Sequence, residues 1–253
     1  MGVLNGKVAI ITGAGQGVGR GIAIAFGQEG ASVLVTGRTE SKLGPVCEEV
    51  VKAGGRAAAI ACDVKNPADL QKVVDKALAE FGGIDILVNN AQEVPLGPLN
   101  GVTDEQFEAG WESGPLATFR LMKLCHPHMK ARGGGSIINL ATSAAMRWDM
   151  GNYGCYAAVK EAIRSLTRAA AAEWGPDNIR VNTVAPHAMS PALEGWISSR
   201  PAEAKEFFKT IPLGRVGALV EDIGRAVVML VGPDSRYVTG ITLPLDGGQA
   251  RFV

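Results

Sequence analysis

The chain is poor in several residues that define whole classes of protein. It has 253 residues, of which only three are histidine and four are cysteine, and aromatic residues make up 6%. The cysteines are widely scattered and have no C-x-x-C spacing, which argues against a disulfide framework and against a cysteine-based metal site. They fit buried thiols in a reducing compartment, so we expect a cytoplasmic protein that holds no metal.

A charge imbalance and a long hydrophobic run are also missing. Lysine plus arginine and aspartate plus glutamate number 25 each, so there is no support for binding to nucleic acid, to an anionic membrane or to an acyl carrier protein. No apolar stretch reaches the ~18 residues of a membrane-spanning helix. The first residues also lack the charged segment and apolar run of a secretory signal. We therefore expect a soluble protein without nucleic-acid or membrane partners.

What the chain does contain is a regular alternation of short apolar runs with longer amphipathic stretches. Most runs are apolar on both sides, which is typical of strands buried beneath helices. The runs span 7–12, 31–36, 56–62, 84–90, 136–141, 179–185 and 241–246, and the helical patterns span about 17–29, 40–53, 67–81, 104–131, 153–174 and 219–231. This alternation predicts one α/β domain over 1–253, a doubly wound fold with a parallel sheet of about seven strands.

One stretch, 187–218, breaks this alternation. It carries Pro191, Pro201 and Pro212 around short helical pieces. We interpret it as an insertion over the carboxyl edge of the sheet, where ligands bind in open α/β sheets.

The first apolar run leads directly into a glycine-rich loop, "TGAGQGVGRGIAIAF", which starts at residue 12. Its glycines let the backbone turn sharply and approach a pyrophosphate, and the helix that follows offers free N–H groups. A tight turn without a ligand is the alternative, but the position between a buried strand and a helix favours a dinucleotide. The residues expected at the phosphates are Gly13, Gly15, Gln16, Gly17, Val18 and Gly19.

Together with two further motifs, this loop resembles the short-chain dehydrogenase/reductase family. The other motifs are "NNA" at 89–91 and Tyr156-x-x-x-Lys160, and "YVTGITLPLDGG" at 237–248 is similar to the family's last strand. The resemblance covers essentially the whole chain. It implies a Rossmann fold, a nicotinamide cofactor and reversible oxidation of an alcohol to a carbonyl compound.

Two tyrosines compete for the role of proton donor. Tyr156 and Lys160 are four positions apart, so they share one face of a helix, and a neighbouring ammonium should lower the pKa of the phenol toward neutrality. Tyr153 keeps open the Tyr-x6-Lys spacing of the related enoyl reductases. The glycine spacing and the position of Ser143, thirteen residues before Tyr156, favour Tyr156.

The resemblance then implies a mechanism and a set of cofactor contacts. Tyr156 exchanges a proton with the substrate oxygen, Ser143 bonds that oxygen, and Lys160 tunes Tyr156 and bonds the nicotinamide ribose. Beyond the glycine loop, the cofactor residues that the resemblance implies are Arg38, Asp63, Val64, Asn90, Ala91, Tyr156, Lys160, Pro186 and Met189.

The end of the second strand bears on the choice between NADP and NAD. Where NAD-preferring relatives carry an acid for the ribose 2′-hydroxyl, this chain has Gly37, and Arg38 follows. A guanidinium suits a 2′-phosphate, so we expect NADP. The alternative is that Arg38 stacks on the adenine, which would serve NAD equally.

The sequence departs from the family pattern at three places. Gln92 stands for the usual glycine after the N-N-A motif, His187 follows Pro186 in place of a glycine, and the asparagine of the fourth helix falls at Gly114. The next residue, Pro115, has no N–H, so we expect a kink in this helix with free carbonyl groups. Our hypothesis is that such a carbonyl reaches Lys160 through a water molecule; the alternative is a simple kink.

The substrate pocket is expected to include 92–96, 144–148 and 187–200, where methionine, tryptophan and proline suggest a medium-sized apolar ketone or secondary alcohol. The candidate substrate contacts are Ser143, Tyr156, Gln92, His187 and Trp196, although for His187 alone a solvated loop residue is the favoured interpretation. We expect a homotetramer or homodimer through the helices at 104–131 and 153–174. A dehydratase, an epimerase or a cofactor-binding regulatory module on the same fold remains the alternative.

Overall fold

The protein is described here from a computed structural model, which defines residues 2–147 and 151–250. Its centre is a parallel sheet in the order β3-β2-β1-β4-β5-β6-β7. The strands are β1 (Val8–Thr12), β2 (Ser32–Gly37), β3 (Arg56–Ala61), β4 (Ile86–Asn89), β5 (Gly135–Leu140), β6 (Ile179–Pro186) and β7 (Thr242–Leu245). Each strand coincides with one of the apolar runs, so the predicted doubly wound Rossmann fold is confirmed.

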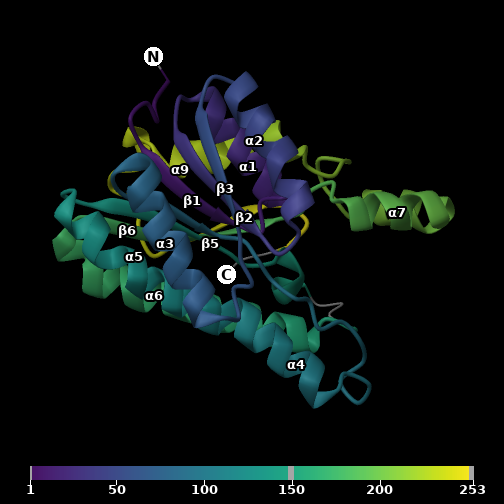
Figure 1. The fold of residues 1–253 in the computed structure, drawn as a ribbon. Helices are drawn as coiled ribbons and strands as arrows, with labels where there is room; N and C mark the ends of the chain where they lie inside the picture. Colours follow the sequence, from purple (N-terminus) through teal and green to yellow (C-terminus); the bar gives the residue numbers. More distant parts are fainter. Residues whose placement is uncertain (1, 148–150, 251–253) are drawn as a thin grey trace.

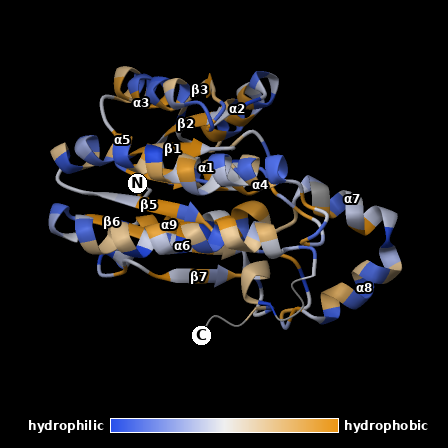
Figure 2. Ribbon diagram, turned by 90° about the horizontal axis from the view of Figure 1, so that it is seen from below, coloured by the Kyte–Doolittle hydropathy of each residue, from blue (hydrophilic) through white to orange (hydrophobic). Residues whose placement is uncertain are grey.

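Helices cover both faces of this sheet (Figure 1). One face is covered by α1 (Gly17–Gln28), α2 (Leu43–Lys52) and α9 (Arg225–Val231), and the other by α3 (Pro67–Phe81), α5 (Ala117–Ala131) and α6 (Gly154–Trp174). Two apolar clusters fill the space between helices and sheet, one on each face, and in Figure 2 the strands and the inward sides of the helices are coloured hydrophobic. Burial on both faces explains why the strand sequences are apolar without alternation.

The predicted helix over 104–131 is not continuous. It consists of α4 (Asp104–Trp111), a π-turn (Glu112–Leu116) and α5. Pro115 lacks the N–H that would pair with the carbonyl of Trp111, and a π-turn shifts the pairing one residue further along, as the bond from the Ala117 N–H to the Glu112 carbonyl shows. The helix is therefore irregular at this point, as expected, but the carbonyls of Ala109 and Gly110 accept side-chain bonds. The link from a carbonyl through a water molecule to Lys160 stays a prediction.

A second π-turn, Leu219–Gly224, precedes α9, where the sequence predicts one regular helix over 219–231. It packs against α1 at glycine contacts: a Cβ on Gly21 would lie 2.4 Å from the Leu219 oxygen, and one on Gly224 would lie 2.6 Å from the Cβ of Ala25. This close approach fixes the start of α1, which carries the glycine-rich loop.

The segment 187–218 contains two short helices, α7 (Pro191–Ser199) and α8 (Pro201–Lys209). Both project beyond the carboxyl edge of the sheet, away from its layers (Figures 1 and 2). Trp148, part of the expected substrate pocket, lies outside the described residues. Within 2–147 and 151–250, the structure contains no helix of the length and apolar character needed to span a bilayer.

Candidate active site

The loops that follow β1 to β6 carry most of the candidate site residues, and Tyr156 and Lys160 stand on α6. Because the sheet is parallel, these loops emerge at one edge. A cleft of about 480 Å³ opens there on the side of β1, β2 and β3. It is lined by Gly13, Gly15, Gln16, Gly17, Val18, Gly37, Arg38, Thr39, Lys42, Leu43, Cys62, Asp63, Val64, Asn90, Ala91, Gln92, Glu93, Ser113, Ser190 and Pro191.

The glycine-rich loop forms one end of the cleft. Gly13 and Gly17 have φ values of +63° and +57°, a region that disfavours other residues, and a Cβ on Gly13 would lie 2.9 Å from the Cα of Ala91. A Cβ on Gly17 would meet nothing within 4 Å. Gln16 caps α1 without a side-chain hydrogen bond, and its side chain instead accepts a bond of 2.6 Å from Lys42. The loop therefore leaves the backbone of Gly17 and the amino end of α1 open to a ligand in the cleft.

Thr12 and Asn90 fasten this loop to the end of β4. The Thr12 hydroxyl accepts bonds from the N–H groups of Asn90 and Ala91, at 2.9 and 3.0 Å. The Asn90 side chain donates back to the carbonyls of Thr12 and Gly13, at 2.9 and 3.1 Å. Asn90 and Thr12 thus join the two loops by hydrogen bonds. Thr12, the first residue of the glycine-rich motif, was not among the predicted site residues.

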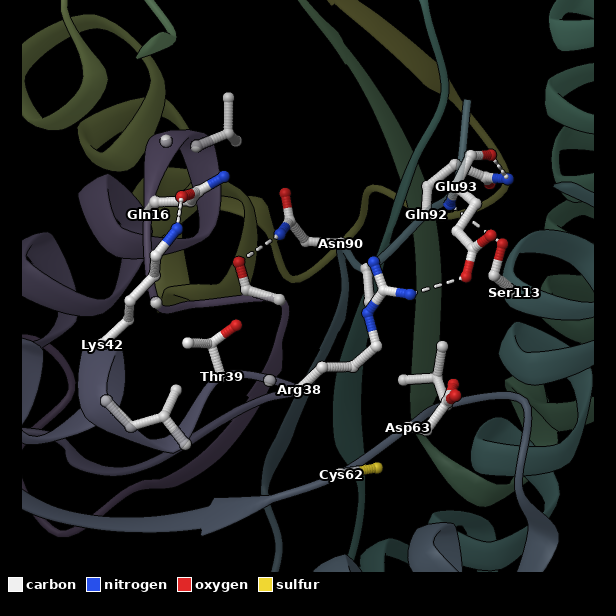
Figure 3. A pocket seen from close by; sticks show the side chains of 18 of the residues that line it. Gln16, Arg38, Thr39, Lys42, Cys62, Asp63, Asn90, Gln92, Glu93 and Ser113 are labelled. Atoms are coloured by element: carbon white, nitrogen blue, oxygen red, sulfur yellow. Dashed lines mark hydrogen bonds and ion pairs between the residues drawn. The ribbon is translucent and has the colours of Figure 1, made fainter. Parts of the chain in front are cut away.

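Arg38 extends across the cleft toward the loop after β4 (Figure 3). Its Nη1 donates a bond of 2.8 Å to Oε1 of Glu93, and the Lys65 ammonium lies 2.9 Å from the same oxygen. The bond with Glu93 raises the pKa of Lys65 above its ordinary value. One carboxylate therefore binds two cations at the rim of the cleft, and no motif in the sequence indicated this arrangement.

Asp63 and Val64 line the same part of the cleft, as the resemblance implies. The Asp63 carboxylate accepts a bond of 3.0 Å from the Lys65 N–H, which shapes the turn after β3. Cys62 is buried beside them, and desolvation raises the pKa of its thiol to about 11, so it stays protonated and unreactive at neutral pH. No group of three or more histidine, cysteine or acidic side chains in the described part of the chain could hold a metal ion.

Tyr156 and Lys160 share one face of α6, as predicted. The Lys160 ammonium is deeply buried, donates a bond of 2.7 Å to the carbonyl of Leu140 at the end of β5, and lies 5.6 Å from the centroid of the Tyr156 ring. Burial lowers the pKa of Lys160 to about 7. Tyr153, by contrast, begins the helix with 39% of its surface exposed.

The expectation that Lys160 lowers the pKa of Tyr156 is wrong for this structure. Burial raises the pKa of Tyr156 to about 12, and a hydrogen bond with the Thr142 side chain offsets only part of this rise. The physical reason is that desolvation disfavours the phenolate more strongly than its neighbours favour it. Tyr156 is therefore a protonated phenol at neutral pH, ready to donate.

Ser143 is buried at the start of a short 3₁₀ turn (Ser143–Met146) that packs against α6. Behind it, a buried polar network fixes α6 to the sheet. Asn139 on β5 donates a bond of 2.9 Å to Thr167 on α6 and accepts one of 2.8 Å from Asn89. The catalytic candidates thus stand on a helix whose position relative to β4 and β5 is set by hydrogen bonds.

Gln92 lines the cleft beside Glu93 (Figure 3), and its carboxamide is bonded to α4. Its Nε2 donates to the carbonyls of Glu93 and Gly110, at 2.8 and 2.7 Å. Ser113 in the π-turn accepts a bond of 2.9 Å from the Glu93 N–H. The carboxamide of Gln92, a candidate substrate contact, is thus bonded to the backbone, and Ser113 is a further residue of the cleft that no sequence motif indicated.

His187 and Trp196 meet in an aromatic cluster beside β6. Phe207 on α8 lies between them, with ring centroids 5.3 Å from His187 and 5.6 Å from Trp196. Burial lowers the pKa of His187, so the ring is neutral, and the favoured interpretation of His187 as a solvated loop residue is wrong. Pro186 ends β6, and the Met189 N–H is held at 3.0 Å by the carbonyl of Gly217. Through Phe207, the predicted substrate residues His187 and Trp196 belong to one aromatic wall.

These observations fit a dinucleotide. The cleft runs from a glycine loop at the start of a helix, past a cation at the end of β2, to Asn90 and Gln92 at the end of β4. It crosses the point where the strand order reverses between β1 and β4, which is where doubly wound sheets bind nucleotides. Fold and cleft together define the class of doubly wound dinucleotide-binding domains.

Comparison with known proteins makes this class specific. A family model described as enoyl-(acyl carrier protein) reductase matches residues 13–250. A 12alpha-hydroxysteroid dehydrogenase of Clostridium sp. is 44% identical over 260 residues, covering 99% of both chains. The 7alpha-hydroxysteroid dehydrogenase of Escherichia coli K12 is 36% identical, covering 98% of this chain and 96% of the relative. The chain belongs to the short-chain dehydrogenase/reductase family, as the sequence motifs indicated.

Solved structures agree. A 7alpha-hydroxysteroid dehydrogenase complexed with NADH and 7-oxo glycochenodeoxycholic acid superimposes with a TM-score of 0.91 at 35% identity, covering 98% of this chain and 96% of the other. Levodione reductase gives the same TM-score at 28% identity, covering 97% and 98%. The chain is thus an oxidoreductase by family.

Proposed function

We propose that this protein interconverts a ketone and a secondary alcohol with a nicotinamide dinucleotide, and that its substrates are hydroxysteroids or ketones of similar size. The observation that carries the proposal is the pairing of Tyr156 with the buried Lys160 on α6, at the sheet edge that also forms the cleft. The hydroxysteroid dehydrogenases among the relatives support the substrate class.

A bound nicotinamide dinucleotide would supply or accept the hydride. The chain's own residues handle the substrate oxygen. Tyr156, protonated at neutral pH, gives its proton to this oxygen during reduction and takes it back during oxidation. Ser143, one residue after Thr142 on the loop that follows β5, donates a hydrogen bond to the same oxygen. Lys160 interacts with the ribose of the cofactor and with Tyr156.

In the cleft, the glycine loop would hold the phosphates of the cofactor, and Arg38, Asp63 and Val64 would contact its adenosine. We propose NADP as the preferred form. Gly37 offers no carboxylate to a ribose 2′-hydroxyl, and Arg38, with 62% of its side chain exposed, can turn a planar guanidinium to a 2′-phosphate. The ion pair with Glu93 opposes this preference, because a carboxylate and a phosphate compete for the same cation.

The aromatic wall formed by His187, Trp196 and Phe207 suits the flat apolar face of a fused-ring substrate. The wall lies next to the turn that carries Ser143, because Arg147 at the end of this turn lies 5.8 Å from the centroid of the Phe207 ring. The model described as an enoyl reductase raises the second candidate, reduction of an enoyl thioester with Tyr153 as the donor. The exposure of Tyr153 favours Tyr156.

We also propose a homodimer or homotetramer. Phe107, Trp111 and Phe119 on α4 and α5 are 36%, 44% and 40% exposed, and Ala169 and Ala172 on α6 are exposed as well. Such apolar faces are typical of subunit interfaces. The four cysteines are free thiols, in keeping with a reducing compartment, and a cytoplasmic location stays a prediction.

The test is a substrate panel with purified protein and each cofactor. It contains 7-oxo glycochenodeoxycholic acid, steroids with a 7α- or 12α-hydroxyl, levodione and an enoyl thioester, and the readout is the absorbance of reduced nicotinamide. We expect turnover of at least one steroid. Exclusive turnover of the enoyl thioester would establish the second candidate, and product formed without net cofactor change would indicate a dehydratase or an epimerase.

A further inference from the structure

Gln92 and Gly114 fit together in a way that neither residue explains alone. A Cβ placed on Gly114 would lie 2.3 Å from Oε1, 2.8 Å from Nε2 and 2.9 Å from Cδ of Gln92. The carboxamide of Gln92 therefore occupies the space in which any side chain at position 114 would begin. Both positions are departures from the family pattern, and the structure brings them into direct contact.

The carboxamide cannot simply move aside, because it is bonded at its nitrogen. Nε2 donates to the carbonyl of Gly110 at 2.7 Å and to that of Glu93 at 2.8 Å. Oε1 is buried and accepts no hydrogen bond within residues 2–147 and 151–250, so this end is positioned by packing against Gly114. Displacing the side chain would leave both carbonyls without this donor, which is unfavourable for a polar group that is shielded from water.

These bonds hold an irregular piece of helix. The π-turn follows Gly110 and Trp111 directly, and side chains add to the backbone pairing there. Gln92 donates to the Gly110 carbonyl, and Ser113 donates at 2.6 Å to the Ala109 carbonyl, which also accepts the N–H of Glu112. Ser113 also accepts from the Glu93 N–H at 2.9 Å. Two hydrogen bonds thus join the loop after β4 to this irregular stretch, one donated by Gln92 and one accepted by Ser113.

The π-turn in turn supports the catalytic helix. Ser113, Gly114 and Pro115 are buried, and the turn packs against α6, which carries Tyr156 and Lys160. A shift of the π-turn would therefore change the position of α6 relative to β5, whose last residue, Leu140, bonds Lys160. The loop after β4 also carries Glu93, which binds Arg38 and Lys65 at the rim of the cleft.

We propose that Gln92 is a positioning residue for catalysis, whose carboxamide takes the place of the side chain absent at Gly114 and holds the π-turn against the catalytic helix. The two residues then form one unit: glutamine at 92 requires glycine at 114, and a side chain at 114 requires a small residue at 92. This inference rests on the proposed function for its kinetic readout only.

The test is a double-mutant cycle with Gln92→Gly, Gly114→Asn and the combined variant. Each single change should lower kcat by about tenfold or more, and the combination should recover most of this loss, because an asparagine at 114 can fill the space that Gln92 leaves. The control is Gly44→Asn on α2, where a Cβ meets nothing within 4 Å and no effect on kcat is expected. Losses that simply multiply in the combined variant would overturn the proposal.

Two further measurements separate positioning from mere packing. The pH profile of kcat should shift in the single variants and return in the combined one, since the groups being positioned are Tyr156 and Lys160. Gln92→Glu, which keeps the volume but removes the Nε2 donor, should behave like Gln92→Gly. Unchanged kcat and pH profile in the folded single variants, or full activity in Gln92→Glu, would overturn the proposal.

The melting temperatures of the wild type, the two single variants and the combined variant allow the same double-mutant comparison without a substrate. If no carbonyl compound is turned over but the melting temperatures still show recovery in the combined variant, the proposed function fails and the pairing of the two residues stands. Independent effects on both melting temperature and kcat would overturn the pairing, whatever the reaction is.

Discussion

The ammonium group of Lys160 donates a hydrogen bond of 2.7 Å to the backbone carbonyl of Leu140, in a part of the protein that contains almost no water-accessible surface. This bond ties the catalytic helix α6 to the end of β5, the strand next to β4. It also explains why a lysine can be tolerated in the core: its charge has an oriented carbonyl as partner, and its pKa of about 7 allows it to lose the charge.

The first prediction concerns the stability of the protein with pH. The pKa of Lys160 is about 7 in the folded chain and near its ordinary value of 10.5 in the unfolded chain. Between these values the unfolded state binds more protons, so the stability of the wild type rises with pH. Relative to Lys160→Met, the wild type should therefore gain melting temperature as the pH increases from 7 to 10.

The matched control for this measurement is Lys52→Met, since Lys52 is exposed at the end of α2. Its melting temperature should keep a constant difference from the wild type across the same range. Circular dichroism at a series of pH values measures both variants. A difference between wild type and Lys160→Met that does not change with pH would show that the buried amine is not what titrates.

The second prediction distinguishes the two tyrosines. Tyr156→Phe should lower kcat/KM by about 10²–10⁴-fold, the usual cost of losing a positioned proton donor. Tyr153→Phe should change it only slightly, because the Tyr153 ring is 39% exposed at the first turn of α6. Fluorescence titration with the reduced cofactor should show that both variants still bind it. The opposite ranking of the two variants would support the enoyl-reductase spacing.

The third prediction concerns Glu93 and the choice of cofactor. Glu93→Gln releases Arg38 and Lys65 from their shared carboxylate, so it should lower the Kd for NADPH and leave that for NADH nearly unchanged. Arg38→Ala should act in the opposite sense and weaken NADPH more than NADH. Both effects should fade as salt is added, because the groups are partly exposed. Equal changes for the two cofactors would mean that Arg38 only stacks on the adenine.

The fourth prediction concerns the assembly. Light scattering at micromolar concentration should give the mass of a dimer or a tetramer. Phe119→Glu, which places a charge on the exposed apolar face of α5, should reduce this mass. Val51→Glu on α2 is the control, since Val51 is 56% exposed on the other face of the sheet. A monomeric wild type would refute the assembly.

Much of this architecture could be predicted from the sequence because local signals determine it. Strands buried on both faces must be apolar, a glycine loop between a strand and a helix has few alternatives, and residues four apart on a helix share a face. These rules located all seven strands and placed Tyr156 beside Lys160. The π-turn was foreseeable in part, since a proline at 115 removes a specific N–H.

The side-chain partners could not be predicted in this way. The position of Gln92 in the sequence does not reveal that its carboxamide turns toward Gly114, because the π-turn and the loop after β4 meet only in the folded chain. The same holds for Glu93 with Arg38, which lie fifty-five residues apart. The pKa of Tyr156 was misjudged because spacing reports the neighbouring charge but not the degree of desolvation.

The α7–α8 segment has a consequence for motion. The two helices contact each other more than they contact the sheet, and the Phe207 ring of α8 contacts His187 at the end of β6. Such a segment opens as a local unit while the sheet stays closed, so its amide hydrogens should exchange with solvent much sooner than those of β1 or β5. Substrate bound against the aromatic wall would slow this exchange. Comparing the exchange of α7 and α8 with and without substrate would therefore show whether the substrate binds there.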